Sequence, residues 1–354
     1  MHRTAPLLSI CILTYNRAAL LLEAVESILS QVTDDNLDRI EVVVCDNAST
    51  DDTPLIMNGI KSKARVRFNY HRNEANLGYD RNLIKAVEIA SGEYCWLFCD
   101  DDLIFPGAVD RMLIEIEGNP NVDVFMCNYE EFDLLRRKLI CVSSGLSIDH
   151  DKTFDFKSEK IFSYLGLVRN MAGLFGFTSV LVLRRAEALS AIDKSGFVGS
   201  DYIHIYLVMA VLWREREGVL KYLSSRLVRM GVGSQRVYEK YFFKRTIMEI
   251  ECVYLMSLSV FSDPRSIRMV GNIILRSGGF SQVVNAKILG GFQFYSRIMP
   301  PLFRNYWSYP VFWLRISPLF FIPGSLLRFL RWAYRSTIII FEFIKRKMIN
   351  EVRS

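Results

Sequence analysis

The fold of this chain is decided by the stretch Glu93-Tyr-Cys-Trp-Leu-Phe-Cys-Asp-Asp-Asp102. Its first seven residues are almost uniformly apolar, which is typical of a strand buried on both faces of a parallel sheet. Ligands of open α/β sheets bind beyond the carboxyl ends of such strands, where the three aspartates stand. Adjacent carboxylates repel one another unless a cation lies between them, and Mg²⁺ prefers oxygen ligands. The stretch therefore predicts a metal site that holds a phosphorylated substrate. The alternative is a solvated acidic turn or a helix N-cap.

The first third of the chain alternates apolar strand patterns with helical patterns. We expect a helix from an N-cap at Asn16 through about Gln31, a second with Thr53 as its cap and Pro54 as its first residue, and a third from about Asp80 to Ala90. The strands that we expect around them are Leu7–Leu13, Ile40–Cys45, Arg65–Tyr70, Glu93–Cys99 and Val122–Cys127. This alternation predicts an α/β fold whose mostly parallel sheet is flanked by helices.

Beyond residue 130 the pattern is less regular. Phe175–Leu183 is typical of a strand or a buried segment, and Tyr202–Trp213 of a buried helix. Residues 240–300 are expected to be helical, with breaks at 277–279 and 290–291 where glycines gather.

Polar clusters follow four successive strands of the predicted sheet: Thr14-Tyr15-Asn16-Arg17, Asp46-Asn47, Asn76 to Asn82, and Asp100 to Asp102. Each cluster alone fits an ordinary turn, because Asn, Asp, Ser and Gly favour turns for local reasons. If the sheet is parallel, the four clusters meet at one edge and line one crevice. Their combination therefore favours a binding site over four unrelated turns.

These strings, taken together, resemble the motif series of family-two glycosyltransferases. The resemblance is carried by Leu8 to Arg17, Val44-Cys-Asp-Asn-Ala-Ser-Thr-Asp-Asp-Thr53, Asn76-Leu-Gly-Tyr-Asp-Arg-Asn82 and Asp101-Asp-Leu-Ile-Phe-Pro-Gly107, and it covers roughly residues 7–235. It implies the GT-A fold, a nucleotide-sugar-binding α/β domain. Within the family, the third string and the Glu93–Asp102 stretch are most similar to the abequosyltransferase group of bacterial O-antigen assembly.

The resemblance also implies which residues meet the nucleotide-sugar donor. The Thr14–Arg17 turn and Asp46 resemble the pieces that hold the base and the ribose, and Asn76, Gly78 and Arg81 resemble a loop that closes over the nucleotide. Arg81 can meet a phosphate, because a guanidinium matches phosphate geometry. The alternatives are a plain turn aspartate at position 46 and a solvated arginine at position 81. The donor-binding residues implied are Thr14, Tyr15, Asn16, Arg17, Asp46, Asn76, Gly78, Arg81 and Asp100.

Asp100, Asp101 and Asp102 resemble the family's Asp-x-Asp metal motif, which implies a divalent cation, Mn²⁺ or Mg²⁺. The chain departs from the family at Cys99, where a frequent Asp-x-Asp-Asp pattern has its first acid. Either Asp100 and Asp102 form the metal-binding pair, or Asp101 and Asp102 do.

A catalytic base is implied by the segment Gly199-Ser-Asp-Tyr-Ile-His204. Family members carry a Glu-Asp pair here. Ser200 replaces the Glu, whereas Asp201 keeps the second acid and is expected to deprotonate the acceptor hydroxyl in an inverting reaction. His204 shares the helix face with Asp201 and can assist it or bind the acceptor. The alternatives are an ordinary N-cap for Asp201 and a core histidine for His204. More loosely, Arg229 and Gly231–Arg236 resemble a segment that contacts the diphosphate.

The charge and composition limit where the protein can act and what it can bind. The net charge is +6, yet residues 301–354 hold nine Lys or Arg and two Asp or Glu, so the positive charge belongs to the tail. The chain contains no run of 18 or more uncharged apolar residues, the length that would span a bilayer, and we expect no signal peptide. The seven cysteines are mostly within apolar runs, which indicates buried, reduced thiols in a cytoplasmic protein.

Residues 307–354 mix aromatic residues, arginines and prolines, and after Gly324 they follow a helical pattern with one basic and one apolar face. Such helices lie in membrane interfaces and bind anionic lipids. The alternative is a helix that packs on the catalytic domain. Nucleic acid is a poor partner, because the acidic crevice would repel it.

The domain division that we predict has three regions. A GT-A domain spans residues 1–235, with a nucleotide-sugar-binding half at 1–130 and an acceptor-binding, catalytic half at 131–235. A helical extension follows at 236–306, and an amphipathic membrane-associating tail at 307–354.

Together these features predict a glycosyltransferase at the inner face of the cell membrane. It would move a hexosyl or deoxyhexosyl group from a nucleotide sugar to a polyprenyl-diphosphate-linked saccharide in O-antigen-like synthesis. A nucleotidyltransferase is a second enzyme hypothesis. Such an enzyme would need a Gly-rich phosphate-binding loop after the first strand, and the segment Thr14–Arg17 contains no glycine. A non-enzymatic alternative is a degenerate donor-binding scaffold, which the altered positions Cys99 and Ser200 keep open.

Overall fold

A computed structural model describes residues 5–134, 137–157, 161–192, 196–213, 217–232, 246–290, 292–330 and 332. The strands are β1 (Leu8–Thr14), β2 (Ile40–Asp46), β3 (Arg67–Arg72), β4 (Tyr94–Cys99), β5 (Leu103–Ile104), β6 (Val124–Asp133), β7 (Lys138–Ser143), β8 (Lys152–Asp155), β9 (Leu181–Arg184) and β10 (Val219–Val232). The helices are α1 (Ala18–Leu29), α2 (Thr53–Lys61), α3 (Tyr79–Ile89), α4 (Ala108–Gly118), α5 (Phe162–Leu165), α6 (Arg185–Ile192), α7 (Ile203–Trp213), α9 (Val253–Val260), α10 (Pro264–Arg276), α11 (Gly278–Gly290), α12 (Met299–Tyr306) and α13 (Pro318–Phe321). Short helical turns are η1 (Thr178–Val180), η2 (Met248–Cys252), η3 (Phe294–Ile298) and η4 (Phe312–Ile316).

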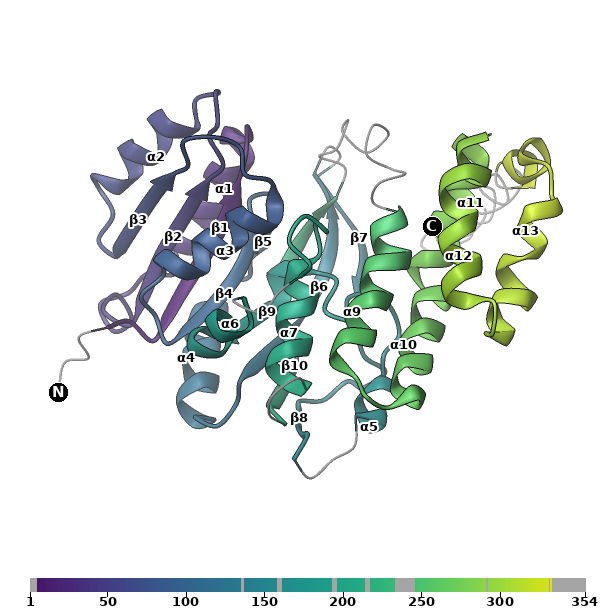
Figure 1. Cartoon of the computed structure of the whole chain (residues 1–354). Coiled ribbons are helices and arrows are strands. Elements are labelled where there is room, and N and C mark those ends of the chain that lie inside the picture. The colour runs from purple at the N-terminus through teal and green to yellow at the C-terminus, as the bar shows by residue number, and fades with distance from the viewer. Residues whose placement is uncertain are drawn as a thin grey trace, which may run out of the picture.

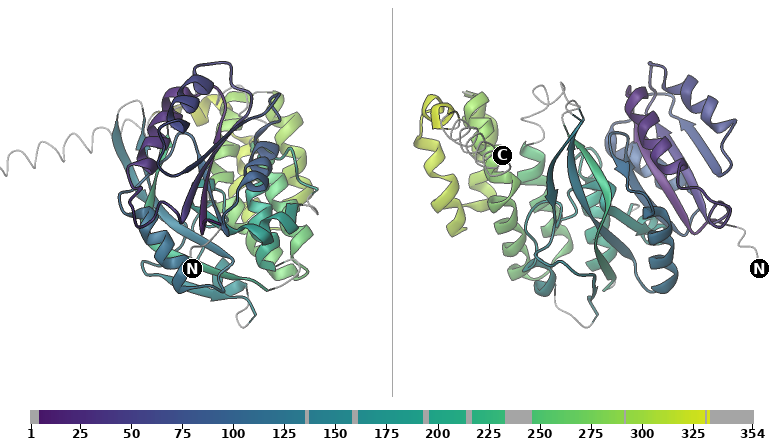
Figure 2. Two further views of the ribbon diagram at one scale, coloured as in Figure 1. Left: turned by 90° about the vertical axis from the view of Figure 1, so that its left-hand side faces the viewer. Right: turned by 180° about the vertical axis from the view of Figure 1, so that it is seen from behind.

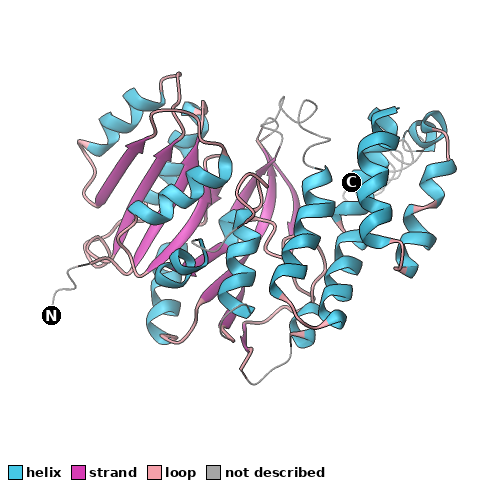
Figure 3. Cartoon of the chain, in the orientation of Figure 1, coloured by secondary structure: helices cyan, strands magenta, loops and turns pink. Residues whose placement is uncertain are grey.

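The strands of the described residues form one sheet with the order β3-β2-β1-β4-β9-β6-β10-β5, in which β7 pairs with β6 and β8 with β10 (Figures 1 and 3). β1 and β2 are buried at every residue, because helices and loops cover both of their faces. The predicted α/β fold with a central sheet and flanking helices is confirmed.

The sheet combines parallel and antiparallel pairing. β3, β2, β1 and β4 are parallel neighbours, and so are β6 and β10, whereas β9 runs antiparallel to both β4 and β6. The sheet is therefore mixed, and its longest parallel run is confined to the strands whose connecting helices the sequence pattern revealed. An antiparallel neighbour needs no helical crossover, so strand-helix alternation gives no sign of it.

Two predicted element boundaries need correction. β3 is shifted two residues towards the C-terminus, at Arg67–Arg72, and β6 runs from Val124 to Asp133. The segment Phe175–Leu183, predicted as a strand or a buried segment, is mostly buried, and its end belongs to β9. β6 extends beyond its apolar run because it pairs with both β10 and β7. Pairing of this kind lies outside what local hydrophobicity reports.

The helices α9–α13 gather at the end of the molecule opposite β3 and α2 (Figures 1 and 2). α10 begins where Asp263 accepts hydrogen bonds from the amides of Arg265 and Ser266, with Pro264 at the first helical position. It ends at Arg276, and α11 follows from Gly278, which confirms the predicted break near 277.

Residues 324–330 are also helical. The rest of the predicted amphipathic tail, 333–354, lies outside the described residues, as does the predicted domain boundary at 235. None of the helices formed by the described residues has the length and hydropathy needed to cross a membrane.

Candidate active site

The polar clusters do meet at one edge of the sheet. Thr14 at the end of β1 is in register with Asp46 at the end of β2, which is in register with Arg72 at the end of β3. On the other side of β1, Leu13 is in register with Cys99, so Asp100 follows at the same level. Parallel strands bring their carboxyl ends to one edge, and the predicted convergence is confirmed for these clusters.

Asp100 turns towards β1 and the turn that follows it. Its carboxylate accepts hydrogen bonds from Thr14 Oγ1 at 2.8 Å and from Arg17 Nη1 at 2.9 Å. Burial, together with the neighbouring charge of Asp101, raises the pKa of Asp100 to about 6, although Arg17 and Thr14 oppose this rise. Thr14 and Arg17, which the sequence assigned to the nucleotide, thus hold the first aspartate in this structure.

Asp102 is held by two residues from distant segments of the chain. The Ser179 hydroxyl and the Gly231 amide, the latter at 2.9 Å, donate to its two carboxylate oxygens. Burial and the charge of Asp101 raise the pKa of Asp102 well above its ordinary value. Gly231 has to be glycine, because a Cβ there would lie 2.0 Å from the carbonyl oxygen of Asp101.

Cys99, Asp101 and Asp102 place their Sγ and carboxylate oxygens within 4.8 Å of one another. Asp100 is outside this group, because its oxygens face Thr14 and Arg17. A cation fits the group: the buried carboxylate of Asp102 has a raised pKa and no cationic partner among the described residues, and carboxylate oxygens suit Mn²⁺ and Mg²⁺. Arg17 Nη1 lies 3.1 Å from Asp101 Oδ2, so a cation here would share Asp101 with that guanidinium. Burial also raises the pKa of the Cys99 thiol well above its usual range. The two aspartates are therefore the stronger candidate ligands.

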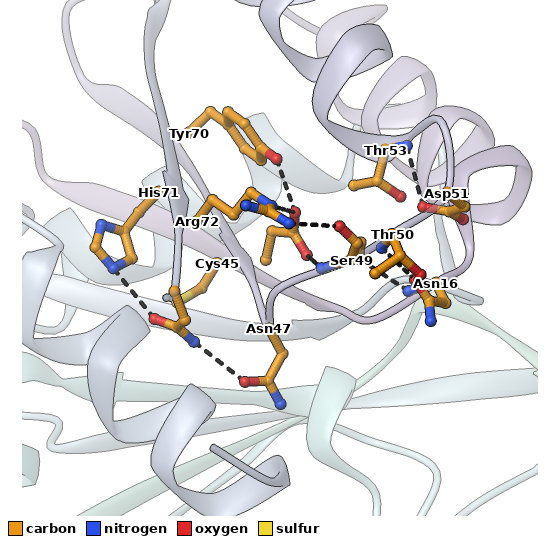
Figure 4. A network of polar contacts seen from close by, with 12 residues as sticks. Asn16, Cys45, Asn47, Ser49, Thr50, Asp51, Thr53, Tyr70, His71 and Arg72 are labelled. Atoms are coloured by element: carbon orange, nitrogen blue, oxygen red, sulfur yellow. Dashed lines mark hydrogen bonds and ion pairs between the residues drawn. The ribbon is translucent and has the colours of Figure 1, made fainter. Parts of the chain in front are cut away.

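Asp46 organises the loop after β2 (Figure 4). Its carboxylate is fully buried and accepts hydrogen bonds from the Ser49 amide at 2.8 Å and the Tyr70 hydroxyl at 2.7 Å, while Arg72 Nε lies 3.7 Å away. Both oxygens thus have partners in the protein. Arg72 is half-exposed, and its Nη2 also donates to the Ser49 carbonyl oxygen at 2.8 Å. The guanidinium is therefore held at the rim of the loop, where its exposed side can face a phosphate or a ribose.

Asn16 does not cap α1, contrary to the prediction. Its φ of 53° places it in the left-handed region that asparagine tolerates, and its Oδ1 accepts from the Thr50 amide at 2.7 Å (Figure 4). The first amide of α1, Ala18 N, instead donates to Asp51 Oδ2 at 3.0 Å. Tyr15 is exposed beside these contacts. The loops after β1 and β2 are therefore tied together across the sheet edge.

The third cluster is a lattice of asparagines beside this edge. Asn47 donates to Asn76 Oδ1 at 2.8 Å, and Asn73 donates to both Asn47 and Asn82. Gly78 has a φ of 81°, which few other residues adopt, and it starts α3. Arg81, one turn into α3, is exposed. Asn76 and Gly78 thus shape the loop, and Arg81 stays open to an anionic ligand.

Asp201 is exposed, has a φ of 63° and stands just before α7. Its amide donates to Asp80 Oδ2 at 3.0 Å, and the amides of Gly199 and Ile203 also donate to the Asp80 carboxylate. Asp80 therefore fixes the segment that presents Asp201, a role that the sequence did not assign to it. The signal was present, since Asp80 is the acid of Asn76-Leu-Gly-Tyr-Asp-Arg-Asn82.

His204 lies in the core, which argues against the catalytic role expected for it. The side chain is buried, and burial lowers the pKa of His204 to about 3, so the imidazole is neutral at any physiological pH. Its Nδ1 lies 3.3 Å from the Tyr79 hydroxyl, which in turn contacts Thr178 at 2.6 Å. The buried His204 thus fits the alternative of a core histidine, whose Nδ1 contacts Tyr79 beside Thr178, the neighbour of the Ser179 that holds Asp102.

The loosely matched diphosphate segment is only partly described. Arg229 donates to Glu130 Oε1 at 2.7 Å and stacks over the rings of Phe105 and Phe132. It is thus committed to partners within the protein. Gly231 supports Asp102 through its amide, whereas Arg236 lies outside the described residues.

Comparisons of the sequence and of the fold with known proteins both lead to glycosyltransferases. The profile of "Glycosyl transferase family 2" matches residues 9–189, just over half of the chain. The abequosyltransferase RfbV of Salmonella typhimurium is 32% identical over 226 residues, which are 63% of this chain and 66% of that protein. The GalNAc(5)-diNAcBac-PP-undecaprenol β-1,3-glucosyltransferase of Campylobacter jejuni is 31% identical over 30% of this chain and 34% of its own length. The matches thus span two thirds or less of these curated relatives.

The fold resembles that of S. aureus TarS 1-349, solved in complex with UDP-GlcNAc, with a TM-score of 0.62 and 16% identity over 92% of this chain and 87% of that one. A mannosyltransferase of Pyrobaculum calidifontis, solved with GDP-Man and Mn²⁺, has a TM-score of 0.53 at 15% identity and covers 90% of this chain and 86% of its own. These likenesses show the GT-A type of fold.

Proposed function

We propose, from the premise that this chain belongs to glycosyltransferase family 2, that it transfers a sugar from a nucleotide-sugar donor to a saccharide acceptor. The observation that carries the proposal is the meeting of the β1, β2 and β4 ends, where an aspartate cluster stands next to partly exposed arginine side chains. Such an edge suits a metal-bound diphosphate with its nucleoside in the crevice.

Asp101 and Asp102, with Cys99 beside them, are the residues that would hold Mn²⁺ or Mg²⁺. A divalent cation there would neutralise the charge that develops on the leaving nucleoside diphosphate. The mannosyltransferase of P. calidifontis, which was solved with Mn²⁺, supports the choice of metal class. Asp100 keeps Thr14 and Arg17 in place next to this pair.

Asp201 is the residue that would deprotonate the acceptor hydroxyl. It is exposed, and Asp80 holds its backbone. An exposed carboxylate on a fixed backbone can accept a proton from a bound hydroxyl, which is what an inverting transfer requires. The donor would supply a hexosyl or deoxyhexosyl group, in keeping with the abequosyltransferase relative.

The acceptor is proposed to be a saccharide on a polyprenyl diphosphate, in bacterial O-antigen-like synthesis at the inner face of the cell membrane. The name of the Campylobacter relative, which contains a PP-undecaprenol-linked saccharide, supports this choice of carrier. The abequosyltransferase relative supports the choice of pathway, through the resemblance to the abequosyltransferase group. The basic composition of residues 301–354 supports contact with an anionic leaflet.

A donor-binding scaffold without catalysis is the second candidate. Two observations favour it: a protonated thiol at Cys99 where an acid is usual, and Ser200 in place of an acid before Asp201. Both candidates require the nucleotide site, and only the first requires turnover.

The first experiment is thermal unfolding with a panel of nucleoside diphosphates, each with Mn²⁺ or with EDTA. A ligand that binds the folded state raises the midpoint in proportion to RT ln(1 + [L]/Kd). We expect one base to give a metal-dependent shift, which Asp101→Ala and Asp102→Ala abolish and the exposed control Asp35→Ala keeps. A shift that survives both active-site substitutions would remove the metal site. A normal shift with no product from a lipid-linked saccharide would favour the scaffold.

A further inference from the structure

Two adjoining hollows lie on the helical end of the molecule and share Arg276. The first, of about 240 Å³, lies between the turn after α5 and α10, and it is lined by Arg169, Asn272 and apolar side chains such as Met269. The second, of about 380 Å³, lies between α10 and η4 and is lined by Leu314 and Arg315. We call the two hollows together the arginine groove, defined by Arg169, Asn272, Arg276 and Arg315.

The charge of this groove is not balanced by nearby acids. Arg169, Arg276 and Arg315 are all exposed, and within the described residues no carboxylate forms an ion pair with them. Other surface arginines do find acids, as Arg304 does with Glu251. Arg315 instead stacks over the ring of Phe280, 5.9 Å from its centroid. Three cations close together without acids attract an anion that carries more than one charge.

The groove is also built for a ligand with an apolar portion and hydroxyl groups. Its walls contain Leu165, Met269, Ile273 and Leu314, and Leu314 is 78% exposed. The buried Oδ1 atom of Asn272 has no hydrogen-bond donor among the described residues. A buried amide oxygen without a donor is costly, and a sugar hydroxyl would satisfy it.

Exposed aromatic side chains stand close in the chain to the Leu314 and Arg315 that line the second hollow. Trp313 and Phe321, on η4 and α13, are exposed, and the tryptophan is a residue typical of membrane interfaces. A ligand in the groove can therefore keep a lipid chain in the membrane while its head group remains on the protein.

We infer that the arginine groove binds the diphosphate and first sugar of the polyprenyl-linked acceptor. The arginines would pair with the diphosphate oxygens, Asn272 would accept from a sugar hydroxyl, and the lipid would leave over Leu314 towards the exposed aromatic side chains. This inference rests on the proposed function, and it assigns the acceptor's anchor to a place apart from the donor site. A free phosphate would not need the apolar walls, and an anionic bilayer alone would not need a hollow.

The test uses the full chain and two kinds of phosphatidylcholine vesicle. One kind carries undecaprenyl diphosphate, and the other carries phosphatidylglycerol in the amount that gives the same negative charge. Arg276→Gln and Arg315→Gln are expected to weaken binding to the diphosphate vesicles on the order of 10- to 100-fold. Arg265→Gln is the matched control, because this exposed arginine lies on the same helix outside the groove. We expect it to change binding less than about twofold, and all variants to keep their unfolding midpoints.

Equal losses on both kinds of vesicle, or the same loss in Arg265→Gln, would overturn the inference in favour of general surface charge. Unchanged binding in both groove variants would overturn it as well. The nucleotide-dependent thermal shift of the same wild-type sample separates the two proposals. If nucleotide and metal raise the unfolding midpoint but the chain does not bind undecaprenyl diphosphate, only the proposal for the arginine groove is wrong. If the chain binds the diphosphate through these arginines but no nucleotide raises the midpoint, the proposed glycosyltransferase function is wrong.

Discussion

At the scale of single residues, His204 shows how burial turns a titratable group into a source of pH-dependent stability. The pKa of this imidazole is about 3 in the folded chain, because it is buried, and about 6.5 in an unfolded chain. At a pH between these two pKa values, His204 is protonated in the unfolded chain and neutral in the folded chain. Stability therefore falls as the pH drops from about 6.5 to about 3, by at most about 4–5 kcal/mol.

His204→Phe is expected to remove that contribution to the pH dependence, because the ring remains but no longer titrates. Denaturant unfolding at pH 7, 6, 5 and 4 measures the slope, with exposed His150→Gln as the control that keeps it. The same variant should transfer sugar with an unshifted pH profile. A slope as steep as in the wild type would show that His204 is protonated in the fold, and a shifted rate profile would restore its catalytic role.

At the scale of elements, the start of α7 depends on Asp80 in α3. This carboxylate accepts from the amides of Gly199, Asp201 and Ile203, so it does for this segment what an N-cap does for an isolated helix. Asp80→Asn keeps the shape but loses the charge. We expect it to reduce stability by about 1–3 kcal/mol and to lower kcat at least about tenfold, because Asp201 loses its fixed backbone.

The expected signature is a split between chemistry and donor binding. The metal-dependent nucleotide shift should remain in Asp80→Asn, while turnover falls. Exposed Asp52→Asn, which stands before α2 without a side-chain cap bond, is a control of the same chemical change. Loss of donor binding together with turnover would mean that Asp80 supports the whole fold and has no special link to Asp201.

The end of β10 supports the aspartates in a second way, through close backbone approach. A Cβ at Gly231 would meet the Asp101 carbonyl at 2.0 Å, so Gly231→Ala must push β10 away from Asp102. We expect it to weaken Mn²⁺-dependent nucleotide binding about tenfold or more, since Asp102 loses its amide donor. Gly118→Ala, where the new methyl meets open space in α4, should leave binding unchanged. Titration with Mn²⁺ at fixed nucleotide would check both, and equal affinities in the two variants would contradict the argument.

At the scale of the whole molecule, the described C-terminal helices present large apolar side chains to solvent. Phe321 is 85% exposed and Trp313 is 51% exposed, and arginines stand nearby in the chain. A surface of this kind favours a membrane interface. Trp313→Ser with Phe321→Ser is expected to reduce binding to phosphatidylglycerol vesicles about tenfold or more, whereas Leu55→Ser, which changes an exposed apolar residue on α2, should not. Vesicle co-sedimentation at low and high salt measures this, and unchanged binding would assign the surface to packing with protein.

The sequence by itself determined the strands that build the site and the edge at which they meet. The apolar run Glu93–Cys99 and the polar residues Thr14, Asp46 and Asp100 are local signals, because each reports the burial of one short segment and the point where it ends. Parallel strands then bring those points together without further information. The resemblance to the family motifs also singled out the third cluster, which includes Asp80. It did not reveal that Asp80 holds the segment before α7.

Only the tertiary structure decided how the aspartates divide their tasks. Asp100 faces Thr14, 86 residues earlier, and Asp102 is held by Ser179 and Gly231, 77 and 129 residues later. Asp80 meets the amide of Gly199 across 119 residues, and His204 is buried against Tyr79 across 125. Such contacts depend on how loops pack after the sheet has formed. A pattern within one segment carries no record of a partner that the chain brings in from so far away.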